Sequence, residues 1–125
     1  MFKYKSGPSL RVHHFFTQIN LLTFQDGVIV TKFDILNYLK QHSQEFHKNY
    51  HVEKIGLFGS FARNEATKDS DIDIYVKMKP NLFNMIAVKE QIEEDLNTKV
   101  DIIREHKNIK PFFLEMITKD LIYAE

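Results

Sequence analysis

The fold is decided by the segment Gly59-Ser60-Phe61-Ala62-Arg63-Asn64-Glu65-Ala66-Thr67-Lys68-Asp69-Ser70-Asp71-Ile72-Asp73-Ile74. It ends with two aspartates that a single isoleucine separates. Side chains at positions i and i+2 of a strand share one face, so Asp71 and Asp73 are expected to point together. Two adjacent carboxylates repel each other, and a divalent cation such as Mg²⁺ between them removes that repulsion. The segment therefore predicts a metal-binding pair of acids.

The segment begins with a glycine and a serine that follow an apolar run. A glycine at this place lets a ligand approach the backbone closely. If Ser60 begins a helix, its hydroxyl and the free amides beyond it face an incoming anion, and the helix dipole adds attraction. Arg63, one turn later, could place a positive charge near a phosphate, although an arginine there is equally well explained as a surface residue. A turn that holds an anion beside a strand that holds a cation predicts a nucleotide site.

A third acid is expected on a neighbouring strand. Asp101 fits this position because Val100 and Ile102 flank it in a run that otherwise looks buried. A charged residue in such a run should be paired or bound to a metal. Three other acids lie nearby, but we expect them on the surface of a helix and rank them below Asp101: Glu93, Glu94 and Asp95.

Outward from this segment, apolar periodicity predicts alternating strands and helices. Three short apolar runs are expected to form strands: Val52–Phe58, Asp71–Met78 and Lys99–Arg104. A capping box at Thr31 and Asp34 opens a helix over residues 32–49. Two further helices are expected, one through Met85, Val88, Ile92 and Leu96, and a last one capped by Asn108. Its apolar stripe is interpreted as core: Ile109, Phe112, Phe113, Met116 and Ile117. Helices should therefore cover at least one face of the sheet.

Composition excludes several classes of protein. The 125 residues fit one domain, and 17 basic and 17 acidic side chains give a net charge of +0, which favours neither a nucleic-acid nor a membrane partner. Without cysteine there are no disulfides or thiolate metal sites, which suits a reducing cytoplasm. No apolar run approaches the ~20 residues of a membrane span, and no signal peptide is expected. The six histidines show no metal-binding spacing, and four of them are expected at the surface or half-buried: His13, His14, His42 and His47.

The first thirty residues carry no clear period. They contain turn signals at Ser6-Gly7-Pro8 and Asp26-Gly27. We therefore expect residues 1–30 to form an N-terminal extension and residues 31–125 to form the domain.

The order of Gly59-Ser60, Asp71-x-Asp73 and Asp101 resembles the signature of the nucleotidyltransferases of the DNA polymerase beta superfamily. The wider segment is similar to the minimal nucleotidyltransferases, which are often antitoxins paired with HEPN-domain ribonuclease toxins. This resemblance covers about residues 31–125 and implies an α+β nucleotidyltransferase fold, a small mixed sheet flanked by helices. Asn64 stands where the family usually has glycine, and asparagine tolerates a left-handed backbone well.

The resemblance also implies a mechanism. Asp71, Asp73 and Asp101 would be the catalytic and metal-binding residues, holding two Mg²⁺ ions, and Asp101 could accept the acceptor proton. Nucleotide binding would fall to four residues: Gly59, Ser60, Arg63 and Ser70. An acceptor hydroxyl would attack the α-phosphate of ATP, and pyrophosphate would leave. In antitoxin relatives the transferred nucleotide is AMP and the acceptor is a tyrosine of the partner toxin, as in type VII-like toxin–antitoxin pairs.

Two alternatives remain open. The first is a nucleotidyltransferase for a small molecule, although such relatives usually carry an additional substrate-binding domain, which this chain lacks. The second is an antitoxin that neutralises its toxin by covering it, without catalysis. A homo- or hetero-oligomer is compatible with each reading.

Overall fold

The computed structural model describes residues 30–125. Eight elements follow in the order α2 (Lys32–Tyr50), β1 (Val52–Phe58), α3 (Gly59–Ala62), β2 (Ile72–Met78), α4 (Leu82–Leu96), β3 (Val100–Arg104), α5 (Pro111–Asp120) and β4 (Ile122–Tyr123). The expected extension, with its turn signals and His13-His14, lies outside the described residues except for Val30, which is buried in the core. The division of the chain at residue 30 stays a prediction.

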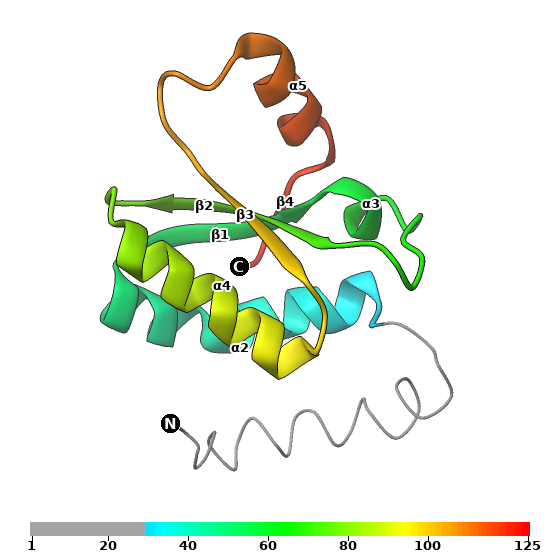
Figure 1. The fold of residues 1–125 in the computed structure, drawn as a ribbon, viewed down its shortest axis with the longest axis horizontal. Helices are drawn as coiled ribbons and strands as arrows, with labels where there is room; N and C mark the ends of the chain where they lie inside the picture. Colours follow the sequence, from blue (N-terminus) through cyan, green and yellow to red (C-terminus); the bar gives the residue numbers. More distant parts are fainter. Residues whose placement is uncertain (1–29) are drawn as a thin grey trace.

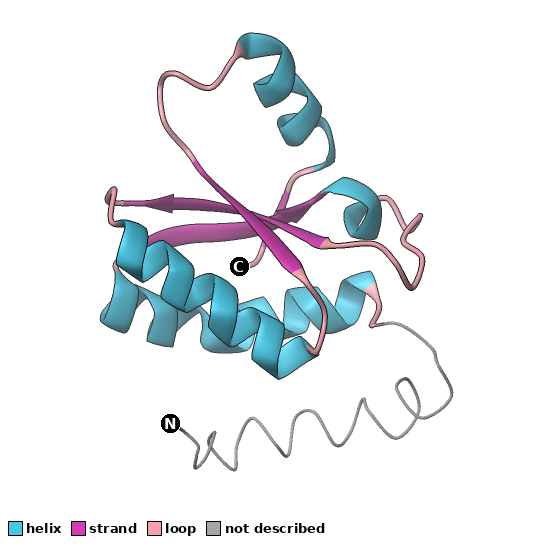
Figure 2. Cartoon of the chain, in the orientation of Figure 1, coloured by secondary structure: helices cyan, strands magenta, loops and turns pink. Residues whose placement is uncertain are grey.

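The four strands form one mixed sheet (Figure 2). Their spatial order is β3-β2-β1-β4, with β1 antiparallel to both β2 and β4 and with β2 parallel to β3. Strand β2 is one of the two inner strands, and its Ile72, Ile74 and Val76 point to one face and are completely buried there. The expectation of an α+β fold with a small mixed sheet flanked by helices is confirmed.

The helices lie on both sides of this sheet (Figure 1). Helices α2 and α4 pack together under one face, whereas α5 lies on the opposite side. The core fills the layer between the α2–α4 pair and the sheet, and its fully buried members include Ile35, Leu39, Phe46, Ile92, Leu96 and Val100. Within residues 30–125, no helix combines the length and apolar character needed to cross a bilayer.

Helix α2 begins with the expected capping box. The Thr31 hydroxyl accepts from the Asp34 amide at 3.2 Å, and the Asp34 carboxylate accepts from the Thr31 amide at 2.9 Å. Farther along the helix, the Tyr38 ring stacks on His42 with 4.1 Å between centroids. His42 is buried, so the expectation of a surface or half-buried histidine was wrong at this position.

The acids that follow the middle of α4 also differ from expectation. Glu94 is exposed, but Asp95 is buried and accepts a hydrogen bond from the Tyr38 hydroxyl. Glu93 is half-buried and accepts from the Val100 amide at 2.9 Å. The prediction of a surface position was therefore wrong for Asp95, because its polar partner lies across the helix interface rather than nearby in sequence.

The C-terminal part departs most from the sequence-based picture. Helix α5 begins at Pro111, a residue whose fixed φ suits the first helical position, so the predicted cap at Asn108 was wrong. Of its apolar stripe only Ile117 is buried, whereas Phe112, Phe113 and Met116 are 73%, 42% and 53% exposed. The core interpretation was wrong for those three side chains. Strand β4 was not predicted, since two residues carry no readable period.

Candidate functional site

The parallel pairing of β2 and β3 brings the predicted acids to one end of the sheet. Asp73 lies directly opposite Asp101 in the register of the two strands. Asp71 precedes β2 and lies two residues before Asp73, so it belongs to the same face. Asp71 and Asp73 are half-buried, and Asp101 is exposed. The structure therefore places Asp73 and Asp101 next to each other on adjacent strands, with Asp71 directly before β2.

The proximity of these acids is reflected in their electrostatics. The pKa of Asp73 is raised from its ordinary 3.8 to about 6, first by partial burial and then by the nearby carboxylates of Asp101 and Asp71. The Arg63 guanidinium opposes this rise only weakly. Neighbouring carboxylates repel one another when they ionise, and a bound cation would remove that repulsion.

The donor chemistry suits a hard divalent ion, because carboxylate oxygens are the ligands that Mg²⁺ prefers alongside phosphate oxygens. In the described part of the chain, however, no three acidic or histidine side chains are grouped tightly enough to hold an ion as they stand. Asp101 is exposed, so its side chain is free of packing that would prevent it from turning toward Asp73. The residues fit the ion in kind, with a side-chain adjustment at the exposed acid.

Gly59 connects this acid cluster to the turn after β1. Its φ of +79° belongs to the left-handed region that favours glycine. A Cβ atom at Gly59 would lie 2.0 Å from Oδ2 of Asp73, far inside any contact distance. Both the backbone conformation and the close approach of the Asp73 carboxylate therefore require glycine here.

The turn continues into α3, which is a single turn of four residues. The Arg63 amide donates to the Gly59 carbonyl at 3.1 Å, and the Glu65 amide donates to the Ser60 carbonyl at 2.9 Å. One turn has too few aligned peptides to make the helix dipole that the sequence suggested. Asn64 has a φ of 60°, as expected for a residue in a position usually held by glycine.

Arg63 and Ser70 already have partners within the fold. Arg63 contacts the Glu65 carboxylate through Nε at 2.9 Å and the Asp120 carboxylate through Nη1 at 2.7 Å. The Ser70 hydroxyl accepts from the Thr67 amide at 2.9 Å and so closes the loop before β2. A phosphate role for either side chain would therefore require it to share or exchange these partners.

Four of the predicted residues line one hollow of about 260 Å³. They are Gly59, Ser60, Arg63 and Asp73. Five further residues complete its wall: Phe58, Phe113, Met116, Ile117 and Asp120. Sequence reasoning missed these five, although one signal was present. The apolar stripe of the last helix contains more large side chains than are needed to pack that helix against the core.

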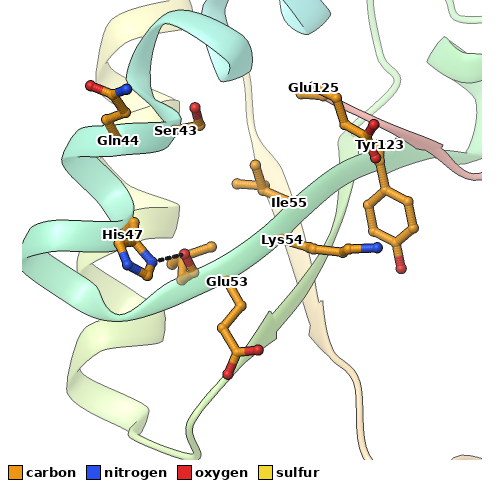
Figure 3. A pocket seen from close by; sticks show the side chains of 10 residues that line it. Ser43, Gln44, His47, Glu53, Lys54, Ile55, Tyr123 and Glu125 are labelled. Atoms are coloured by element: carbon orange, nitrogen blue, oxygen red, sulfur yellow. Dashed lines mark hydrogen bonds between the residues drawn. The ribbon is translucent and has the colours of Figure 1, made fainter.

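A second hollow of about 370 Å³ lies elsewhere, between α2, the start of β1 and the end of the chain (Figure 3). At its rim, Nδ1 of His47 lies 3.1 Å from the Val52 carbonyl, and Nζ of Lys54 lies 4.8 Å from the centre of the Tyr123 ring. Asp71, Asp73 and Asp101 are not part of its lining. This hollow is therefore separate from the acid cluster.

Comparison with known proteins identifies the family. Residues 40–125 match the family described as Polymerase beta, Nucleotidyltransferase. A Methanocaldococcus jannaschii protein with a provisional protein adenylyltransferase name is 37% identical over 92 residues, which cover 72% of this chain and 94% of that protein. Protein adenylyltransferase MntA of Thermococcus cleftensis is 31% identical over 98 residues, which cover 77% of this chain and 98% of that protein.

Solved structures show the same fold. A protein described provisionally as a minimal nucleotidyltransferase superimposes with a TM-score of 0.61 and 25% identity, covering 74% of this chain and 95% of that chain. A tri-AMPylated Shewanella oneidensis HEPN toxin in complex with an MNT antitoxin gives a TM-score of 0.51 at 14% identity, covering 72% of this chain and 71% of that chain. The family match over residues 40–125, the full-length relatives and the shared fold together establish that this chain belongs to the polymerase beta nucleotidyltransferase family.

Proposed function

We propose that this protein is a Mg²⁺-dependent nucleotidyltransferase that transfers AMP from ATP to a tyrosine of a HEPN-domain toxin, and that it acts as the antitoxin of a type VII-like pair. The observation that carries this proposal is the position of Asp73. It lies in register with Asp101, and it shares one hollow with Gly59 and Ser60. The proposed cation site would thereby adjoin the proposed anion site within one small space.

Each residue has a role that follows from its place. Asp71, Asp73 and Asp101 would hold two Mg²⁺ ions, which when bound would neutralise the triphosphate and make the acceptor hydroxyl more acidic. The Ser60 hydroxyl and the backbone at Gly59 would bind the β- and γ-phosphates. Arg63 would add positive charge at the same wall, although its pairing with Glu65 and Asp120 offsets much of that charge. Ser70 would contribute through the loop that it closes.

The transfer step exchanges one bond for another. The acceptor hydroxyl oxygen attacks the α-phosphorus in line and forms the new oxygen–phosphorus bond. The bond between the α-phosphorus and the oxygen that bridges to the β-phosphate breaks, and pyrophosphate leaves with that electron pair. The hydroxyl proton passes to Asp101, whose exposed carboxylate lies beside Asp73. The product is an AMP diester of the acceptor.

The proposed acceptor is supported by relatives rather than by the hollow itself. The similar archaeal proteins bear protein adenylyltransferase names, and the Shewanella oneidensis complex contains a HEPN toxin that carries AMP groups. A partner protein that supplies its own tyrosine requires no acceptor pocket on this chain. The test is to incubate this protein with ATP, Mg²⁺ and a HEPN-domain toxin, and to measure the intact mass of that partner. We expect a gain equal to one or more AMP groups.

The control separates catalysis from simple covering. An Asp71→Ala, Asp73→Ala double variant should leave the partner unmodified, whereas Glu90→Ala, Glu94→Ala, which removes two exposed acids of α4, should modify it normally. A partner whose mass stays unchanged with the wild-type protein would contradict the proposal. If the double variant still suppresses the toxin in cells, neutralisation occurs by binding alone.

A further inference from the structure

The hollow beside Asp73 has two walls of opposite chemistry. One wall is polar and comes from the turn, α3 and β2, with Gly59, Ser60 and Asp73. The other wall is apolar and comes mostly from α5, with Phe113, Met116 and Ile117, and Phe58 completes it from the end of β1. A ligand that fills the whole hollow must therefore be charged at one end and apolar at the other.

The apolar wall is not explained by packing. Ile117 anchors α5 against the rest of the domain and is buried, but Phe113 and Met116 remain 42% and 53% exposed. Apolar side chains are unfavourable in water, so an apolar group that covers Phe113 and Met116 gains binding free energy. Both side chains line the hollow rather than facing away from it. The exposed parts of Phe113 and Met116 therefore face the hollow, where a ligand would bind.

An ion pair holds this wall in place. Asp120, at the end of α5, contacts Arg63 at 2.7 Å, and its side chain is only 14% exposed. Because Arg63 directly follows α3, this pair joins the C-terminal end of α5 to the polar wall. This ion pair therefore links the two walls directly, with the Arg63 side chain 44% exposed and the Asp120 side chain 14% exposed.

We propose that Phe113 and Met116 form the platform on which the nucleobase of the substrate nucleotide packs. A nucleoside triphosphate has the required polarity, with phosphates for the Gly59-Ser60 wall and an aromatic base for the α5 wall. The Phe113 ring offers a face for stacking, and the Met116 thioether makes favourable contacts with aromatic edges. The inference rests on the proposed nucleotidyl transfer and adds to it the residues that recognise the base.

Tyr75 is another aromatic residue near the acids, and it is not available for this role. Its ring is only 2% exposed, and it meets Phe58 edge-on with 6.4 Å between centroids. Its hydroxyl donates to the Glu105 carboxylate at 3.4 Å. Tyr75 therefore packs behind the apolar wall, against Phe58, whereas Phe113 and Met116 line the hollow itself.

The test compares two neighbouring phenylalanines of α5. Phe113 lines the hollow beside Asp73, whereas Phe112 is 73% exposed and lines a separate shallow surface with Pro111 and Leu114. We would measure binding of ATP and of inorganic tripolyphosphate, each with Mg²⁺, by calorimetry. Phe113→Ala should weaken ATP binding roughly 5- to 150-fold and leave tripolyphosphate binding unchanged, because only ATP has a base to stack. Phe112→Ala should change neither affinity.

Each other outcome is decisive. Equal ATP affinity in the wild-type protein and Phe113→Ala, or an equal loss with Phe112→Ala, would overturn the platform while leaving the proposed transfer intact. A parallel loss of ATP and tripolyphosphate binding would show that Phe113 acts only through the fold. If Phe113→Ala does not fold, Met116→Ala takes its place with the same expectation. Failure of the wild-type protein to bind ATP would refute the proposed function and the platform together.

Discussion

The Asp73 carboxylate occupies the space that a side chain at Gly59 would need. Replacing Gly59 with alanine would insert a Cβ atom 2.0 Å from the Asp73 carboxylate and force a residue with a side chain to adopt a φ of +79°. We expect Gly59→Ala to lower the rate of nucleotide transfer by about 100-fold, since a misplacement of about 1 Å has that effect in active sites. Its free energy of unfolding should fall by roughly 1–3 kcal/mol.

Asn64→Gly provides the control in the same loop. Asn64 also has a positive φ, of 60°, but it does not line the hollow. Glycine should retain both activity and stability there, because it adopts this conformation without strain. A near-normal rate of nucleotide transfer by Gly59→Ala would show that the close approach of Gly59 to Asp73 is not required for activity.

Asp73 should destabilise the protein when no cation is bound. Its pKa rises on folding from 3.8 to about 6, mainly through burial, so the folded state holds this proton more tightly than the unfolded chain does. The stability that this proton contributes is present below about pH 4 and is lost as the pH rises through about 6. In chelator at pH 8, Asp73→Asn should therefore be more stable than the wild-type protein by roughly 1–2 kcal/mol, after allowance for solvent screening.

Urea unfolding at pH 8 and at pH 4 measures this difference. The gain should vanish at pH 4, where the wild-type carboxyl is protonated, and Asp69→Asn should show no gain at either pH because Asp69 is exposed. If Asp73→Asn is no more stable than the wild-type protein at pH 8, the ionised Asp73 carboxylate does not destabilise the fold, which would contradict this prediction. The same substitution should abolish nucleotide transfer.

Among whole elements, those with a clear period were predictable from sequence. The three longer strands and α2 were found because apolar residues recur on one face and because Thr31 and Asp34 form a local cap. The Asp73–Asp101 neighbourhood followed from the family resemblance and agrees with the register. These features depend on residues that are close together in the sequence, or on a motif that can be read directly from it.

Elements fixed by distant partners were not predictable. The burial of Asp95 depends on Tyr38, which lies 57 residues earlier. Strand β4 pairs with Gly56 and Leu57 of β1, and a Cβ atom at Gly56 would lie 2.8 Å from the Ile122 carbonyl oxygen. Neither relation leaves a trace in local periodicity. The start of α5 was missed because a polar residue three positions earlier offered a competing cap.

The hydrogen bond between Tyr38 and Asp95 should stabilise the packing of α2 on α4. Tyr38→Phe removes the donor and leaves the buried carboxylate without that partner, whose absence we expect to cost about 1–3 kcal/mol at neutral pH. Tyr50→Phe, a similar change at the half-buried end of the same helix, should cost much less. Chemical denaturation of the two variants measures the difference. Equal losses of stability would show that the Tyr38 hydroxyl contributes no more than the Tyr50 hydroxyl does.

The whole molecule divides into a side that carries the core and a side that carries the proposed site. Under the sheet, α2 and α4 bury the core, and α5 lies on the opposite side (Figure 1), where its residues share a hollow with Gly59, Ser60 and Asp73. The sequence indicated the polar half of this site, because its residues belong to one short motif. It did not indicate the apolar half, because the position of α5 depends on the burial of Ile117 and on the Arg63–Asp120 pair, which spans 57 residues.

The most direct measurement is the Mg²⁺ dependence of ATP binding by the protein alone. If the three acids and the turn form one site, calorimetry should detect ATP binding with Mg²⁺ and little with chelator. The Asp71→Ala, Asp73→Ala variant should lose the binding that depends on Mg²⁺, while Glu90→Ala, Glu94→Ala keeps it. ATP that binds equally well with chelator, or equally well to the Asp71→Ala, Asp73→Ala variant, would contradict a cation-dependent nucleotide site at the ends of β2 and β3.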